Sequence, residues 1–323
     1  MDTGNLDLLP EEVLKEILLL EEHQQRLNTR DEAQKTFMTY VNHVYDGFIV
    51  GRHHKIIAEK LERIASGDLK RLIVNMPPRH SKSEFASYLM PSWFLGRNPK
   101  LKIIQATMNT ELAVRFGRKV RDLIADPRYH EIFPDTDLKP DSQAAGRWET
   151  SAGGEYFAAG VGAAMTGRGA DLLIIDDPHS EQDALSANAY DNAWEWYTSG
   201  PRQRLQPGGS IIIVQTRWSK KDITGRLLQA QAADLMADQW EIVEFPAIMP
   251  SGEPLWPEFW GKDELLKVKA SLSVGKWNAQ WQQNPVSEET AVIKREWWQP
   301  WEEGEPPNLD YIIQSYDTAY SKK

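Results

Sequence analysis

The sequence predicts an α/β fold, in which a mostly parallel β-sheet is flanked by helices. Short uninterrupted apolar runs, such as LLII (172–175) and IIIV (211–214), are typical of strands buried on both faces. Segments with apolar residues at helical spacing separate these runs, and a parallel sheet requires this alternation. The hydrophobic content of 41% and the charged content of 26% are those of a folded protein.

The first 70 residues are expected to be mostly helical, because apolar residues recur at helical spacing in LPEEVLKEILLLEEH and HHKIIAEKLERIA. A strand (RLIVNM, 71–76) and a Pro-Pro turn follow. The next helical pattern (EFASYLMPSWFLG, 84–96) contains Pro91, which is expected to kink or end the helix.

The middle of the chain continues the alternation of strand and helix patterns. The stretch 126–154 contains three prolines and is expected to be loop-rich. Strands are expected at 101–107, 155–160, 172–177 and 208–218, and helices at 111–125 and around 180–199.

Composition changes near residue 240, where the chain becomes rich in Pro and Trp, and this change suggests a smaller appendage with a helical stretch at 263–283. A last strand pattern, YIIQSYD (311–317), follows it. The expected parts are an N-terminal helical region (1–60), a core (61–239), a linker subdomain (240–308) and the start of a further domain (309–323).

Bulk properties exclude several classes of protein. The net charge of −10 argues against a broad basic face for static nucleic-acid binding. The absence of cysteine excludes disulfides and thiolate metal sites, and fits a cytosolic protein. No apolar run approaches the roughly 18 residues of a membrane span, and the acidic N-terminal segment is unlike a secretory signal.

The stretch MPPRHSKSE (76–84) follows the first strand and resembles the phosphate-binding pattern G-x-x-x-x-G-K-[ST], with Met76 and Ser81 in place of the glycines. In such a loop, backbone N–H groups wrap phosphates at a helix N-terminus. Here these are the N–H groups of residues 79–81, because Pro78 has none. Lys82 would reach the phosphates and Ser83 would hold Mg²⁺. The predicted nucleotide-binding residues are Pro78, Arg79, His80, Ser81, Lys82 and Ser83. The alternative is a solvated strand-to-helix turn.

Two adjacent carboxylates end the strand LLIIDD. In strand–helix nucleotide folds the first acid holds Mg²⁺ through water and the second orients or deprotonates the attacking water, which assigns these roles to Asp176 and Asp177. The second acid is usually Glu, and Asp is one methylene shorter. The alternative is a turn that caps the following helix.

The buried strand IIIVQTRW ends in the polar residues Gln215, Thr216 and Arg217, and Thr216 is placed to sense the γ-phosphate, because ligands bind at the carboxyl ends of parallel strands. A strand end with a satisfied hydroxyl is the alternative. Arg79, inside the loop, could stabilise transition-state charge within its own chain. Arg168, in the glycine-flanked TGRGA, suits an arginine finger that reaches a neighbouring subunit, or is a surface arginine.

Four segments together resemble the large terminase subunit, the DNA-packaging ATPase of tailed bacteriophages. They are the variant Walker A loop MPPRHSKSE, the Walker B region TGRGADLLIIDDP, the coupling motif IIIVQTRW, and WNAQWQQNPVSEETAVIKREWW (277–298), which looks like the segment that joins ATPase to nuclease. The resemblance covers roughly residues 35–320. It implies a P-loop NTPase core of the ASCE or RecA-like type.

The resemblance implies ATP and Mg²⁺ as ligands, Lys82, Ser83 and Asp176 as their binding residues, and Thr216 as the coupling residue. An adenine-contacting segment is expected at FIVGRHHK (48–55). The family also carries a nuclease domain with a ribonuclease-H-like fold, whose first strand fits 309–323 with Asp317 as a metal ligand. Because the other acids of that site do not follow, nuclease activity is not expected of this chain.

The implied function is a motor that hydrolyses ATP to translocate double-stranded DNA into a procapsid. The expected partners are transiently bound DNA, a portal protein, the small terminase subunit and further copies of the chain in a ring, with no membrane. The expected location is the cytoplasm of an infected bacterium. Two alternatives remain: a superfamily 2 helicase, because DDPH resembles its D-E-x-H box, and an adaptor with a degenerate nucleotide site.

Overall fold

The computed structural model describes residues 10–183 and 186–286, which belong to one compact unit that reaches Val286. The strand expected at 311–317, its Asp317 and most of the segment 277–298 lie outside the described residues, so these predictions stay predictions. Within the described residues, no helix is long and apolar enough to cross a membrane.

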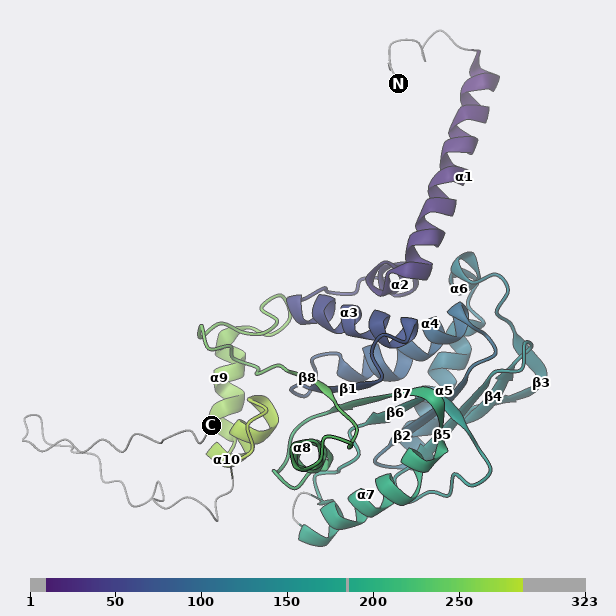
Figure 1. Ribbon diagram of the computed structural model, residues 1–323. Coiled ribbons are helices and arrows are strands. Elements are labelled where there is room, and N and C mark those ends of the chain that lie inside the picture. Colours follow the sequence, from purple (N-terminus) through teal and green to yellow (C-terminus); the bar gives the residue numbers. More distant parts are fainter. Residues whose placement is uncertain (1–9, 184–185, 287–323) are drawn as a thin grey trace, which may run out of the picture. The chain divides into compact units, whose positions relative to one another are not determined.

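A single eight-stranded sheet forms the centre of the unit, with the order β3-β4-β5-β2-β6-β7-β1-β8 (Figure 1). The six strands from β5 to β8 in this order run parallel, and β3 and β4 add an antiparallel edge. The strands are β1 Arg71–Asn75, β2 Lys102–Thr107, β3 Leu138–Ala144, β4 Arg147–Thr150, β5 Glu155–Gly160, β6 Ala170–Asp176, β7 Leu205–Gln215 and β8 Glu241–Glu244.

The strand order defines the class of fold. β1 leads into the phosphate loop and β6 carries the paired acids, and β7 lies between these two strands and pairs with both. An additional strand in this position characterises the ASCE or RecA-like group of P-loop NTPases. The predicted α/β fold with a mostly parallel sheet is therefore confirmed.

Alternate residues of each central strand face two separate hydrophobic cores, which explains the uninterrupted apolar runs. In β6, Leu172 and Ile174 pack in one core, and Leu173 and Ile175 pack in the other. The first core also contains residues of α2 Phe37–Val44, α3 Arg52–Ser66, α4 Met90–Arg97, α5 Thr110–Ile124 and α6 Pro127–Ile132. The second contains residues of α7 Ala187–Ser199 and α8 Ile223–Ala233.

Pro91 is expected to kink or end the helix after the phosphate loop, and the helix does not end there. A π-helical turn, Glu84–Leu89, runs directly into α4, and the N–H of Met90 bonds to the carbonyl of Phe85 five residues earlier. Pro91 is the second residue of α4, so the change from π-helical to α-helical winding falls beside the residue that has no N–H. The change in winding accommodates the proline.

The prediction of a loop-rich stretch at 126–154 is wrong. The segment folds into α6 and the hairpin of β3 and β4. Pro127 starts α6 after the N-cap Asp126, whose side chain accepts the N–H of Arg128. Pro140 lies in β3, the outermost strand, and a sheet edge tolerates the missing donor. The prolines therefore occupy positions that regular structure allows.

The segment after residue 240 begins inside the sheet, because β8 pairs with β1. Beyond β8, a small third core gathers Ala247, Leu265, Trp277 and Trp281. Its helices are α9 Lys262–Ser271, α10 Val274–Lys276 and the π-helical turn Trp277–Trp281. The first helix of the chain, α1 Glu11–Lys35, contributes one fully buried residue, Ala33, near its C-terminal end. The expected domain boundaries stay predictions.

Candidate active site

The phosphate loop turns without glycine. Arg79 and Ser81 adopt positive φ angles of 60° and 69°, a region that glycine enters freely and other residues rarely enter. The loop starts in the register of the sheet, since the N–H of Met76 bonds to the carbonyl of Gln215 at 3.1 Å. Each of these two backbone conformations costs of the order of 1 kcal/mol or more, so contacts with surrounding residues must stabilise them.

His80 and Trp260 provide such contacts. The Nδ1 of His80 lies 2.8 Å from the carbonyl oxygen of Pro78, and its ring stacks on Trp260 at a centroid distance of 6.0 Å. Burial lowers the pKa of His80 to about 4, so the ring is neutral at physiological pH and Nδ1–H donates to the carbonyl. The indole N–H of Trp260 donates to the carbonyl of Arg79 at 3.3 Å.

Lys82 and Asp177 form an ion pair at the end of the loop. Lys82 Nζ lies 2.9 Å from Asp177 Oδ2, and the lysine is 7% exposed. The other carboxylate oxygen of Asp177 accepts the backbone N–H of Thr216 at 2.7 Å. Asp177 itself has a φ of 41°, and its N–H bonds to the carbonyl of Val214 at 2.9 Å. One carboxylate therefore joins the loop after β1 to the ends of β6 and β7.

Asp176 is buried and faces two hydroxyl groups. Ser83 Oγ donates to its Oδ1 at 3.0 Å, and Ser87 Oγ donates to its Oδ2 at 2.7 Å. Burial raises the pKa of Asp176 to about 7, and the carboxylate of Asp177 adds to the rise, while Lys82 and the two serines oppose it. Ser87 was not among the residues predicted from the sequence; its signal is a small polar residue four positions after Ser83, in the turn that follows the loop.

The oxygen atoms of Ser83 and Asp176 are suited to Mg²⁺, which prefers hard oxygen ligands, keeps several waters and is usually completed by substrate phosphates. Across residues 10–183 and 186–286, no group of three or more His, Asp or Glu side chains could hold a metal ion by itself. The pair therefore fits an ion that arrives with a nucleotide.

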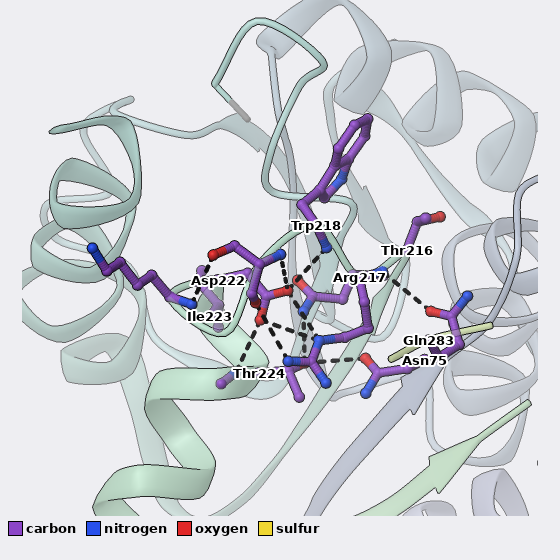
Figure 2. Close-up of polar contacts among 12 residues, drawn as sticks. Asn75, Thr216, Arg217, Trp218, Asp222, Ile223, Thr224 and Gln283 are labelled. Atoms are coloured by element: carbon purple, nitrogen blue, oxygen red, sulfur yellow. Dashed lines mark hydrogen bonds and ion pairs between the residues drawn. The ribbon is translucent and has the colours of Figure 1, made fainter. Parts of the chain in front are cut away.

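The end of β7 brings Thr216 and Arg217 into the site. The hydroxyl of Thr216 lies 3.4 Å from the carbonyl of Met76, the residue that opens the phosphate loop. The guanidinium of Arg217 is buried and pairs with Asp222 at 2.9 Å (Figure 2). It also pairs with Glu244 at 3.2 Å. The sequence places Arg217 at the polar end of this strand, and the tertiary structure adds its ion pairs with Asp222 and Glu244.

Arg168 does not join the other predicted residues of its own chain. Its guanidinium pairs with Glu155 and lies 4.0 Å from the ring centroid of Phe157. Arg168 precedes the first residue of β6, whereas Asp176 is the last residue of this seven-residue strand, which spans roughly 20 Å. The side chain of Arg79, by contrast, is exposed beside the loop.

The segment 48–55, expected to contact adenine, lies at the start of α3. His53 and His54 are buried there, and the Nδ1 of His54 accepts the N–H of Gly51 at 2.8 Å. The ring of His53 lies 6.3 Å from the ring of His80, so this segment packs against the phosphate loop. Contact with adenine stays a prediction.

The fold and the site together define a P-loop NTPase: a lysine and a serine after β1, two adjacent acids at the end of β6 and a polar end to β7 that meets both. No protein-family model matches the chain, and no curated protein matches it.

Solved structures of low identity do resemble the chain. The crystal structure of the HK97 bacteriophage large terminase matches at 11% identity and a TM-score of 0.48, covering 73% of this chain and 51% of that one. The large terminase ATPase domain of Thermus phage P74-26 matches at 14% and 0.45, covering 68% and 89%. The large terminase of a thermophilic bacteriophage in complex with ATP-γ-S matches at 9% and 0.39, covering 68% and 50%.

The chain thus spans about half the length of the HK97 protein and of the protein solved with ATP-γ-S. All three structures come from the family that the sequence motifs resemble. The class of the fold is assigned from the strand order and the site, and not from these structures.

Proposed function

We propose that this chain is the ATPase motor domain of a large terminase subunit from a tailed bacteriophage or prophage. The observation that carries the proposal is the convergence of three separate motifs on one carboxylate. Asp177, from the acidic strand, contacts Lys82 of the phosphate loop at 2.9 Å and the backbone of Thr216 at 2.7 Å. The same three motifs are those that resemble the terminase family in the sequence.

The ion pair between Lys82 and Asp177 is the resting arrangement of the proposed mechanism. ATP phosphates would replace Asp177 as the partner of Lys82, because a polyphosphate carries more negative charge than one carboxylate. Asp177 would then be free to orient the attacking water and accept its proton, while the N–H of Thr216 keeps the carboxylate in place. The exposed Arg79 would stabilise charge on the transferred phosphoryl group.

The ligands proposed for Mg²⁺ are Ser83 Oγ and, through water, the carboxylate of Asp176. The ion would neutralise charge on the β- and γ-phosphates. Ser87 would keep its hydrogen bond to the second oxygen of Asp176 and so fix the direction of the carboxylate.

The short second acid is compatible with this mechanism. The left-handed backbone at Asp177, with its φ of 41°, gives the side chain a direction that an extended backbone would not. The bond from its N–H to Val214 holds that conformation. We infer that the backbone compensates for the methylene by which Asp is shorter than the usual Glu.

The proposal extends to partners. A motor of this family would grip double-stranded DNA transiently, form a homo-oligomeric ring on the portal of a procapsid, meet the small terminase subunit, and work in the cytoplasm of the infected host. The net charge of −10 supports a transient grip in place of a static one. Weak DNA binding is therefore expected, and a gel shift at low salt that gives nanomolar affinity would contradict this part.

The test of the activity is steady-state ATP hydrolysis with Mg²⁺ by the wild-type chain and by Asp177→Asn. Loss of a general base lowers turnover by about 10²–10⁴-fold, and the variant should still bind MgATP, because Lys82 and Ser83 remain. A wild-type chain that neither binds nor hydrolyses MgATP would overturn the proposal. DNA-strand separation by the active chain would favour the helicase over the terminase.

A further inference from the structure

The two successive peptides that meet at the α-carbon of Thr216 lie between the catalytic carboxylate and the segment that follows the third core. The N–H of Thr216 donates to Asp177 Oδ1 at 2.7 Å, and the next N–H, that of Arg217, donates to Gln283 Oε1 at 3.1 Å. Thr216, Arg217 and Gln283 are all buried, and Figure 2 shows the side chain of Gln283 directed at Arg217. Two neighbouring backbone donors therefore hold side chains from different parts of the chain.

Gln283 is itself held in a fixed conformation. Its backbone has a φ of 55°, which non-glycine residues rarely adopt, and its Nε2 donates to the carbonyl of Gln280 at 2.5 Å. The carbonyl of Trp281 accepts the N–H of Ala247 at 2.6 Å, which ties the turn to the third core. The side-chain oxygen of Gln283 is thereby directed at Arg217, and a strained backbone maintained in this way is often found at functional positions.

The side chain of Arg217 cannot move to compensate for loss of this contact. Its guanidinium bonds to Asp222, which is fully buried, and to Glu244 at the end of β8. Asp222 also accepts the N–H groups of Trp218 and Ser219 at 3.1 and 3.3 Å. The turn that starts at Arg217 is thus fixed on its far side, and Gln283 holds it on the side nearest to Thr216.

We propose that Gln283 is a positioning residue for Asp177. Its side-chain oxygen holds the N–H of Arg217, so that the preceding N–H of Thr216 stays directed at the Asp177 carboxylate while water is activated. The inference rests on the proposed ATPase function and extends it, because it assigns control of the catalytic acid to the segment after the sheet. Loss of the oxygen leaves the buried N–H of Arg217 without a partner, which favours rotation of the Thr216–Arg217 peptide. Because the two peptides share the α-carbon of Thr216, this rotation also displaces the N–H of Thr216.

The first test compares Gln283→Met, which keeps the length and removes the acceptor, with Gln283→Glu, which keeps an acceptor. Gln282→Met is the matched control, because Gln282 accepts the N–H of Ile248 and is bonded to no residue of the site. For Gln283→Met, kcat for ATP should fall roughly tenfold, with KM changed by less than about twofold, as expected when orientation and not binding is lost. Gln283→Glu should recover most of the rate, and Gln282→Met should match the wild type.

Equal kcat values for Gln283→Met and the wild type would overturn the inference, as would a Gln283→Glu variant as slow as Gln283→Met. A second measurement does not require turnover: amide hydrogen exchange of the peptide that covers 216–218. Exchange there should be faster in Gln283→Met than in Gln282→Met, and unchanged exchange would overturn the inference. Absence of both MgATP binding and hydrolysis in the wild type would instead count against the proposed function, so the two failures are distinguishable.

Discussion

The two edges of the parallel sheet hold their charged groups in different ways. At the carboxyl edge, Lys82 and Asp176 are almost completely buried, and their partners come from other segments of the chain. At the amino edge, the pairs Arg71–Asp238, Lys60–Glu241 and Arg168–Glu155 keep side-chain exposures between 13% and 30%.

The difference shows where this fold can do chemistry. Burial strengthens electrostatic interactions, and a buried ion pair that loses one partner is costly. A ligand with phosphate groups could replace Asp177 beside Lys82, whereas the pairs at the amino edge already meet water and gain little from a ligand. Geometry also favours the carboxyl ends of parallel strands as ligand sites, since the loops converge there.

The largest effect is expected for Lys82→Ala, which removes the cation of the carboxyl edge. Turnover of ATP should fall by at least roughly a hundredfold, because a charge that stabilises the transferred phosphoryl group is lost. Steady-state hydrolysis and circular dichroism would check the rate and the fold. Lys100→Ala, at an exposed lysine, is the control, and equal rates for the two variants would remove Lys82 from the site.

A second effect is the dependence of the free energy of unfolding on pH, which arises from three buried histidines. Burial lowers the pKa of His53 to about 4, of His54 to about 2 and of His80 to about 4, whereas the unfolded chain takes up these protons near pH 6.5. The unfolded state therefore binds more protons between pH 6.5 and 4, and the free energy of unfolding must fall as pH falls through this range. Each histidine contributes up to about 1.4 kcal/mol per pH unit.

Urea unfolding at pH 7.5 and pH 5 would measure this loss. His53→Phe should lose less stability than the wild type between the two pH values, because it lacks one of the three groups. His23→Gln, in the exposed part of α1, should behave like the wild type. An unchanged pH dependence in His53→Phe would show that His53 is protonated in the folded state as readily as in the unfolded one.

A smaller effect is expected for Trp260→Phe, which keeps an aromatic ring on His80 and removes the indole N–H that holds the carbonyl of Arg79. One neutral hydrogen bond contributes about 1 kcal/mol, so the affinity for MgATP should fall by about fivefold. Titration calorimetry would measure it, with Trp240→Phe as the control. An unchanged affinity for MgATP would show that the phosphate loop is equally stable without this hydrogen bond.

The smallest effect within one chain is expected at the amino edge. Arg168→Ala removes a partly exposed ion pair and a contact with Phe157, which together stabilise the fold by about 1 kcal/mol, and MgATP affinity should not change. If Arg168 is a finger for a neighbouring subunit, mixing inactive Arg168→Ala with inactive Asp177→Asn should restore part of the activity. Mixed samples that stay inactive would leave Arg168 with its structural contact alone.

The strands and their polar ends could be predicted from the sequence, because both signals are local. Apolar runs lie directly before Asp176, or one polar residue before Met76 and Thr216, and each motif follows its strand directly. The hairpin within 126–154 could not, because Pro140 would interrupt a central strand and is harmless in an outermost strand, and only the assembled sheet shows which strand is outermost. The winding change before Pro91 depends likewise on the helix being packed in place.

The sequence by itself determined the class of fold and predicted which residues are proposed to carry phosphate, metal and proton chemistry, since hydrophobic periodicity and motif spacing are properties of short segments. The tertiary structure alone decided the contacts between them: Ser87 on Asp176, Trp260 on the phosphate loop and Gln283 on Arg217. The last two contacts join residues more than sixty positions apart, and they exist because packing of the sheet and the third core brings those segments within hydrogen-bond distance. Residue type at one position contains no information about such a neighbour.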